Sequence, residues 1–86
     1  MAERTVTIGS KSGLHARPAA LFVQHAKSFQ SQITLSKAEK TVNGKSILSI
    51  LTLGAEQGDQ VVLGVNGDDA ESAMNTLVIL LEGNQG

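Results

Sequence analysis

The hydrophobic residues of this 86-residue chain switch repeatedly between two periods, and this alternation restricts the fold more than any other feature. Residues 4–8 and 32–36 alternate apolar with polar side chains, as strands with one buried face do. Residues 60–65 form a third, β-branched run that predicts a strand. Residues 16–29 and 70–81 instead repeat their apolar side chains every three or four positions, which is typical of helices with one buried stripe.

Two shorter segments complete the pattern. Thr41-Val42 follows a polar reversal at residues 37–40, and we expect it to pair back as a short strand. Residues 46–53 are densely apolar and compatible with either a strand or a helix, but Ser46 offers a cap hydroxyl and Gly54 a stop, so we predict a short helix. The predicted order is β-α-β-β-α-β-α. This order favours an α+β fold, an open sandwich with helices on one face of the sheet and water on the other.

Residues suited to helix starts mark the two longer helices. Asp68 and Asp69 precede the last helix, and their carboxylates are expected to cap its N-terminus. Pro18 is the only proline in the chain. Proline is tolerated in the first turn of a helix, where its missing N–H costs nothing. Its position therefore places His15 at or beside the N-cap of the first long helix.

The composition predicts one small globular domain over residues 1–86 and excludes several classes of protein. Seven Lys and Arg against eight Asp and Glu give a net charge of −1, which argues against a nucleic-acid partner. No apolar run approaches the ~20 residues that span a bilayer, so no membrane association is expected. The absence of cysteine excludes disulfides and thiolate zinc sites and fits a cytoplasmic protein. We expect neither a metal nor a cofactor.

Residues 13–19, Gly-Leu-His-Ala-Arg-Pro-Ala, carry the most unusual chemistry. The free N–H groups of Ala16 and Arg17 are expected to point towards the ring of His15, and the helix end and the guanidinium would both favour an anion there. A neutral imidazole has a lone pair for attack, so His15 is a candidate nucleophile towards a phosphoryl group. The alternative interpretation is a surface histidine beside a solvated arginine. His25 lies in mid-helix and is expected to be such a surface residue.

Ser46 is a second candidate site, because a phosphate on an N-cap hydroxyl would gain from the helix dipole. A cap without any further role is the alternative. In the same short helix, Leu48 and Leu51 lie one turn apart, as do Ile47 and Ile50. A core this small can hardly bury both pairs, so one pair is expected to form an exposed patch for a partner, with simple core packing as the alternative.

Enzyme motifs are missing from the sequence. There is no G-x-S-x-G, P-loop or G-x-G-x-x-G. The carboxylates, such as Glu39, Glu56 and Glu71, are scattered along the chain, so paired acid–base chemistry has no support. A small enzyme that used His15 as a general base would lack a second catalytic group. Such an enzyme is therefore the least favoured of the possible functions.

Residues 13–19 resemble the active-site signature of the HPr family, the histidine-containing phosphocarriers of the bacterial sugar phosphotransferase system. Residues 42–47, Val-Asn-Gly-Lys-Ser-Ile, resemble the regulatory serine segment of the same family in its Gram-positive form. The resemblance covers nearly the whole chain. It implies an open-faced sandwich in which three helices cover one face of a four-stranded antiparallel sheet.

The resemblance also implies a role. His15 would accept a phosphoryl group on Nδ1 from phosphorylated enzyme I, which phosphoenolpyruvate charges, and would pass it to the IIA domains of sugar permeases. Ala16 and Arg17 would cradle the phosphate, and Pro18 would shape the helix start. Ser46 would be phosphorylated by HPr kinase/phosphorylase, which slows transfer and favours carbon catabolite repression with a transcriptional regulator. The implied docking surface consists of His15, Arg17, Ala20, Gln24, Ile47, Leu48 and Leu51.

Few positions depart from the family pattern. Gram-positive members often have Met where Leu48 and Leu51 stand, and Leu is the stiffer side chain. Regulatory paralogues without the active histidine are disfavoured, because His15 is present. Two alternatives stay open, namely a regulatory binding module that acts mainly through phosphorylated Ser46 and a nitrogen-branch paralogue. A monomer is expected.

Overall fold

The computed structural model describes residues 2–11 and 13–83. Within these residues the chain forms four strands and three helices, in the order that the hydrophobic periods predict. The elements are β1 (Ala2–Thr7), α1 (Ala16–Lys27), β2 (Gln32–Lys37), β3 (Lys40–Asn43), α2 (Ile47–Thr52), β4 (Gln60–Asn66) and α3 (Ala70–Leu81).

The four strands form one antiparallel sheet in the order β1-β4-β2-β3. Strand β4 is therefore internal, and its Val65 lies opposite Ala2 of β1 on one side and Ile33 of β2 on the other. The last strand in sequence thus joins the first strand to the β2–β3 hairpin. This order brings the loop before β4 close to the segment that follows β1.

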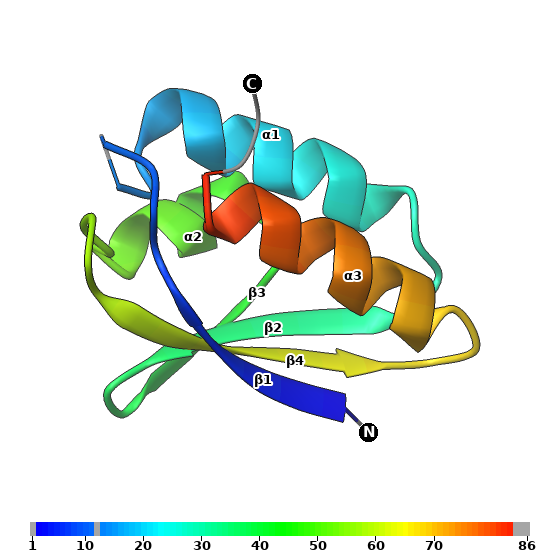
Figure 1. Cartoon of the computed structure of the whole chain (residues 1–86). Coiled ribbons are helices and arrows are strands. Elements are labelled where there is room, and N and C mark those ends of the chain that lie inside the picture. The colour runs from blue at the N-terminus through cyan, green and yellow to red at the C-terminus, as the bar shows by residue number, and fades with distance from the viewer. Residues whose placement is uncertain (1, 12, 84–86) are drawn as a thin grey trace.

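All three helices cover one face of the sheet, and the other face is open, as Figure 1 shows. The alternation in β2 explains this arrangement: Ile33 and Leu35 are buried, whereas Gln32 and Thr34 are exposed. The core lies between the two layers, and α1 and α3 pack against each other above it. Its largest fully buried apolar side chains are Phe22, Ile8, Ile33, Leu35, Ile50, Leu63, Leu77 and Leu81.

The structure differs from the sequence-based expectation at β1 and at the start of α3. Strand β1 covers Ala2–Thr7 rather than residues 4–8, although Ile8 is buried and its N–H still donates to the carbonyl of Asp59 at 2.8 Å. Asp69 occupies the N-cap position of α3, but its side chain makes no cap hydrogen bond. Its carboxylate instead accepts hydrogen bonds from the backbone of Gln30 and from the backbone and hydroxyl of Ser31, in the loop between α1 and β2.

The longest helices, α1 and α3, have 12 residues each. Among the described residues, no helix combines the length and apolar character needed to cross a membrane.

Candidate functional site

His15 is the N-cap residue of α1, as the position of Pro18 predicts. Its backbone is extended, its carbonyl accepts the first helical hydrogen bond from the N–H of Ala19 at 2.8 Å, and its side chain makes no cap hydrogen bond. The side chain is 47% exposed. The imidazole is thus free of any capping role and open to a reaction partner.

The first turn of α1 directly follows His15 and carries groups that favour an anion. Ala16 and Arg17 are the first two helical residues and are exposed, and the amides of a first helical turn have no carbonyl partner in their own helix. Pro18 completes the turn without adding a donor. The Arg17 side chain lines a hollow of about 390 Å³, to which Lys11 also contributes. Two cations and a positive helix end therefore lie on this side of the molecule.

Gly13 allows the segment before His15 to pack closely against the loop that precedes β4. Its φ is +68°, and a Cβ at this position would lie 2.5 Å from the carbonyl oxygen of Ala55 and 2.8 Å from Cα of Glu56. The next residue, Leu14, is buried and donates its N–H to the same Ala55 carbonyl at 2.9 Å. The glycine of the sequence motif thus serves a close approach between backbones.

This approach brings Glu56 to the imidazole. Its Oε2 lies 3.3 Å from Nε2 of His15, and the Glu56 side chain is 64% exposed. The sequence pattern presents Glu56 as one of several scattered carboxylates and does not place it beside His15. The two residues are 41 positions apart, and no local pattern in the sequence joins them.

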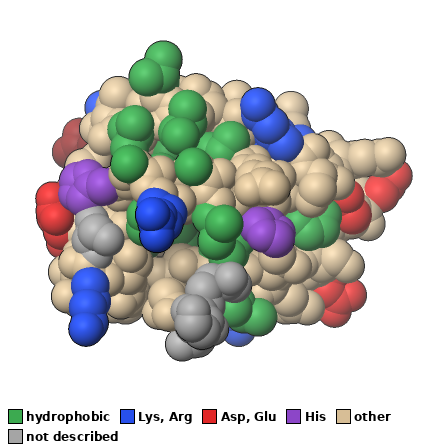
Figure 2. All heavy atoms as spheres, turned by 90° about the horizontal axis from the view of Figure 1, so that it is seen from above, with side chains coloured by type: hydrophobic (Ala, Val, Ile, Leu, Met, Phe, Trp, Pro, Cys, Tyr) green, Lys and Arg blue, Asp and Glu red, His purple; other side chains and the backbone are tan. Residues whose placement is uncertain are grey.

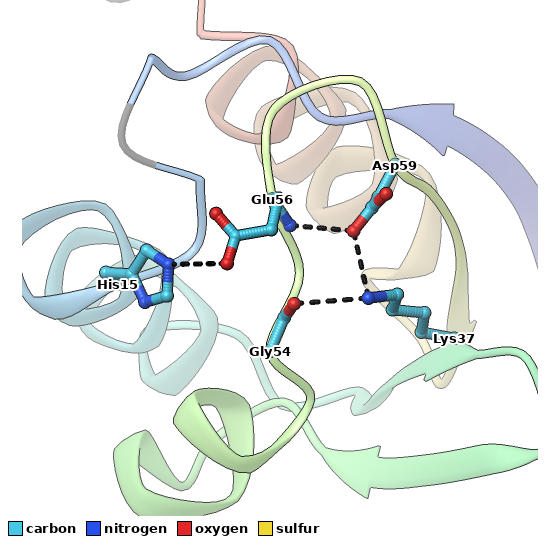
Figure 3. A network of polar contacts seen from close by, with 5 residues as sticks. All are labelled: His15, Lys37, Gly54, Glu56 and Asp59. Carbon is cyan, nitrogen blue, oxygen red and sulfur yellow. Dashed lines mark hydrogen bonds and ion pairs between the residues drawn. The ribbon is translucent and has the colours of Figure 1, made fainter.

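The loop that carries Glu56 is held by a small polar network, drawn in Figure 3. The Glu56 backbone N–H donates to Oδ2 of Asp59 at 2.8 Å. The same oxygen lies 2.9 Å from Nζ of Lys37, which also donates to the carbonyl of Gly54 at 3.1 Å. The hydrogen bond from Glu56 and the contact with Lys37 lower the pKa of Asp59 below its ordinary value, so this carboxylate stays charged.

Ser46 is the N-cap of α2, as expected from the sequence. Its Oγ accepts a hydrogen bond from the N–H of Ser49 at 3.3 Å, and the residue is half-buried. The neighbouring cation is engaged elsewhere, because Nζ of Lys45 donates to the carbonyl of Phe29 at 2.8 Å. The hydroxyl lies at the start of the helix that also carries the exposed apolar side chains.

Helix α2 divides its apolar residues differently from the expected pairs. Ile50 is fully buried, whereas Ile47, Leu48 and Leu51 are 39%, 74% and 36% exposed. The expectation that two residues one turn apart share an environment is therefore wrong for Ile47 and Ile50, whereas Leu48 and Leu51 are both exposed, as one option predicts. Figure 2 shows hydrophobic side chains gathered on the helical face of the molecule.

The residues expected to share this surface come from two helices. Ala20 and Gln24 are exposed on α1, which packs against α2. His25 is exposed as well, in agreement with its interpretation as a surface residue. We define the docking patch as Ala20, Gln24, Ile47, Leu48 and Leu51.

The arrangement around His15 suits a nucleophile better than an acid–base catalyst. An ionised carboxylate only accepts hydrogen bonds, so this contact forms as a hydrogen bond when Nε2 carries the proton, and the lone pair is then on Nδ1. The helix end and Arg17 can stabilise a phosphoryl group attached there. In the described part of the chain, no three His, Cys, Asp or Glu side chains come together as metal ligands.

Comparisons with known proteins agree with this chemistry. A family profile described as "PTS HPr component phosphorylation site" matches residues 2–83. HPr-like protein Crh of Halalkalibacterium halodurans is 43% identical over 82 residues, which cover 95% of this chain and 98% of that protein. Phosphocarrier protein HPr of Streptomyces coelicolor is also 43% identical over 82 residues, with coverages of 94% and 88%.

A solved structure of a relative shows that the fold is shared as well. The crystal structure of HPr-C-His from Thermoanaerobacter tengcongensis has a TM-score of 0.92 and 54% sequence identity to this chain, and the match covers 96% of this chain and 93% of that one. A four-stranded antiparallel sheet under three helices is thus the architecture that the chain shares with this solved relative. The chain belongs to the HPr family of phosphocarrier proteins, which carry a phosphoryl group and are not themselves enzymes.

Proposed function

We propose that this protein relays a phosphoryl group through His15, from phosphorylated enzyme I to the IIA domains of sugar permeases. The observation that carries the proposal is the exposed imidazole at the N-cap of α1, which makes no cap hydrogen bond and precedes amides that have no partner within their own helix. Membership of a family defined by its phosphorylation site supports the same role. The acceptor is Nδ1, because Nε2 faces Glu56.

Each residue of the first turn has a part in this relay. The N–H groups of Ala16 and Arg17 hold the phosphoryl oxygens, and the Arg17 guanidinium neutralises their charge during transfer. Pro18 fixes the backbone at the helix start. No metal or cofactor is needed, since the helix end and the guanidinium supply the positive charge.

The donor and the acceptor dock on the same patch in turn. Its apolar members on α2 and the exposed residues of α1 flank the helix start that carries His15. Exposed apolar side chains that gather on one face are typical of surfaces that bind protein partners.

The test of the relay is the intact mass after incubation with phosphoenolpyruvate and enzyme I. We expect one added phosphate that is lost in acid, survives base and is absent from the His15→Ala variant. Subsequent transfer to a sugar-permease IIA domain would separate a sugar-branch carrier from a nitrogen-branch paralogue. If a competent enzyme I adds no phosphate, the relay is excluded.

Arg17 provides a second test. Arg17→Ala should slow phosphoryl transfer by about tenfold or more, because one preorganised donor to a developing anion is lost. Urea unfolding should be nearly unchanged, since Arg17 is exposed. Arg4→Ala, which removes an exposed cation from β1, is the matched control and should transfer normally. Normal transfer by Arg17→Ala would remove Arg17 from the mechanism.

A second candidate function is a regulatory binding module that acts through phosphorylated Ser46. It is favoured by the match to HPr-like protein Crh at the same 43% identity as the match to HPr, and by the position of Ser46 at the start of the helix with the exposed apolar residues.

In this second function, HPr kinase/phosphorylase would use ATP to add phosphate at Ser46, and a catabolite-control regulator would bind the product. The test is incubation with the kinase and ATP, followed by binding of the regulator. Unaltered partner affinity in the Ser46→Asp variant would count against this function.

A further inference from the structure

We propose that Glu56 is a positioning residue for phosphoryl transfer: its carboxylate accepts the Nε2–H of His15 and directs the Nδ1 lone pair towards the phosphoryl donor. The proposal rests on the relay through His15. Its first support is the 3.3 Å contact between Oε2 of Glu56 and Nε2 of His15. Because a carboxylate can only accept, the contact selects one tautomer of the neutral ring.

The second support is that both chain segments are fixed where they meet. Leu14 donates its N–H to the carbonyl of Ala55, so the residues just before His15 and Glu56 are joined by a backbone hydrogen bond of 2.9 Å. Gly13 lacks the side chain that would separate them. The contact between the His15 and Glu56 side chains therefore follows from a close and fixed approach of the two backbones.

The third support is the network behind Glu56. Oδ2 of Asp59 accepts the Glu56 backbone N–H, and Lys37 joins Asp59 to the carbonyl of Gly54. Figure 3 shows the Glu56 side chain directed from this loop towards the imidazole. The loop backbone is therefore held on the side away from His15. This fixes the position from which the exposed Glu56 carboxylate extends.

The transfer step shows what the carboxylate contributes. The Nδ1 lone pair of His15 forms a bond to phosphorus, while the bond between phosphorus and the donor's leaving atom breaks and its electron pair remains with the donor. The Nε2 proton stays on the ring, so the product is a phosphorylated imidazolium cation, and Glu56 lies beside the proton that bears this charge. In the next transfer the bond between Nδ1 and phosphorus breaks, and its electron pair returns to Nδ1.

Other charges also act on the phosphorylated ring. Arg17, in the first turn of α1, opposes the ring's positive charge, whereas the phosphoryl oxygens and Glu56 favour it. Of these, Glu56 is the carboxylate in direct contact with the ring. Its removal should therefore lower the pH at which the ring is half protonated. The protonated ring releases phosphate faster, because the neutral imidazole is the better leaving group.

The experiment compares Glu56→Gln with Glu39→Gln, which removes the same charge from the exposed turn between β2 and β3. In Glu56→Gln we expect the half-maximal pH for hydrolysis of the isolated phosphoprotein to fall by about 0.5. The apparent kcat with enzyme I should fall about threefold with KM unchanged, since the contact is partly exposed. Glu56→Asp, which keeps the charge, should recover part of both effects, and Glu39→Gln should match the original chain.

The results separate this proposal from the relay itself. Phosphorylation of the original chain but not of His15→Ala tests the relay, whatever Glu56 does. An unshifted hydrolysis profile and an unchanged kcat in Glu56→Gln would overturn the positioning role while leaving the relay intact. A rise in KM alone, with kcat and the pH profile of hydrolysis unchanged, would also overturn the positioning role, because the loss of a docking contact would produce that result.

Discussion

At the scale of single residues, the site depends on a glycine as much as on its histidine. Gly13 has a positive φ, and its backbone passes so close to residues 55 and 56 that no Cβ fits. This approach places the two segments within reach of the Leu14–Ala55 hydrogen bond. The position of the imidazole relative to the loop before β4 is therefore set by a residue without a side chain.

Replacing this glycine should cost more stability than its backbone angle alone predicts. Gly13→Ala would place a side chain at φ +68°, which costs about 1–2 kcal/mol, and would also force the backbone away from the Ala55 carbonyl. Gly54 is the matched control, because its φ is +63° but nothing lies within 4 Å of its absent Cβ. Urea unfolding should show a larger loss for Gly13→Ala than for Gly54→Ala. Equal losses would mean that the close approach relaxes without cost.

At the scale of elements, α2 is a short helix with two separate duties. It has six residues, too few for stability on its own, so its position depends on packing. Ile50 provides that packing from a fully buried position, whereas Leu48 is 74% exposed. Helix α2 thus packs into the core through Ile50 and presents other apolar side chains to solvent.

Alanine variants should separate the contribution of α2 to stability from its contribution to partner binding. Ile50→Ala should lower the free energy of unfolding by about 2–5 kcal/mol, because it leaves a cavity in the core. Leu48→Ala should change it by less than about 0.5 kcal/mol but raise KM for the phosphoryl donor, since it removes an exposed contact. Urea unfolding and transfer kinetics on the same samples measure both effects. Normal KM with every partner would exclude Leu48 from the docking patch.

At the scale of the whole molecule, two carboxylates join segments that are distant in sequence. Asp59 joins the loop before β4 to Lys37 at the end of β2. Asp69, at the start of α3, accepts hydrogen bonds from Gln30 and Ser31, between α1 and β2. Hydrogen bonds, from Ser31 first, lower the pKa of Asp69 below its ordinary value of 3.8. The two halves of the chain are thus held together partly by ionised groups.

These carboxylates should make the fold sensitive to acid. Because the folded pKa of Asp69 lies below the unfolded value, its contribution is present above that unfolded value and is lost as the pH falls through the folded one. Asp69→Asn should therefore lower the urea midpoint at neutral pH, and the difference from the original chain should shrink below pH 3.8. Asp68→Asn removes the same charge from an exposed neighbour and is the control. A difference that did not change with pH would contradict the role of the ionised carboxylate.

The sequence alone determined the order of the elements, the start of α1 and the histidine at its N-cap. These features depend on neighbours within one or two turns: apolar periods select strand or helix, and Pro18 restricts the helix start. The cap at Ser46 and the stop at Gly54 follow from equally local rules, and both agree with the structure. Resemblance to a known family then supplied the function that periodicity could not.

The tertiary structure decided which distant groups meet. In the sequence Glu56 is one of several scattered carboxylates, and Asp69 is predicted to cap its own helix. In the structure Glu56 contacts His15, 41 residues away, and Asp69 accepts a hydrogen bond from Ser31, 38 residues away. The division of Ile47 from Ile50 likewise depended on where α2 meets the sheet. Such contacts follow from the strand order β1-β4-β2-β3, which places the loop before β4 next to the segment after β1. Local propensities do not encode that order, because many strand pairings satisfy the same alternation of apolar and polar residues.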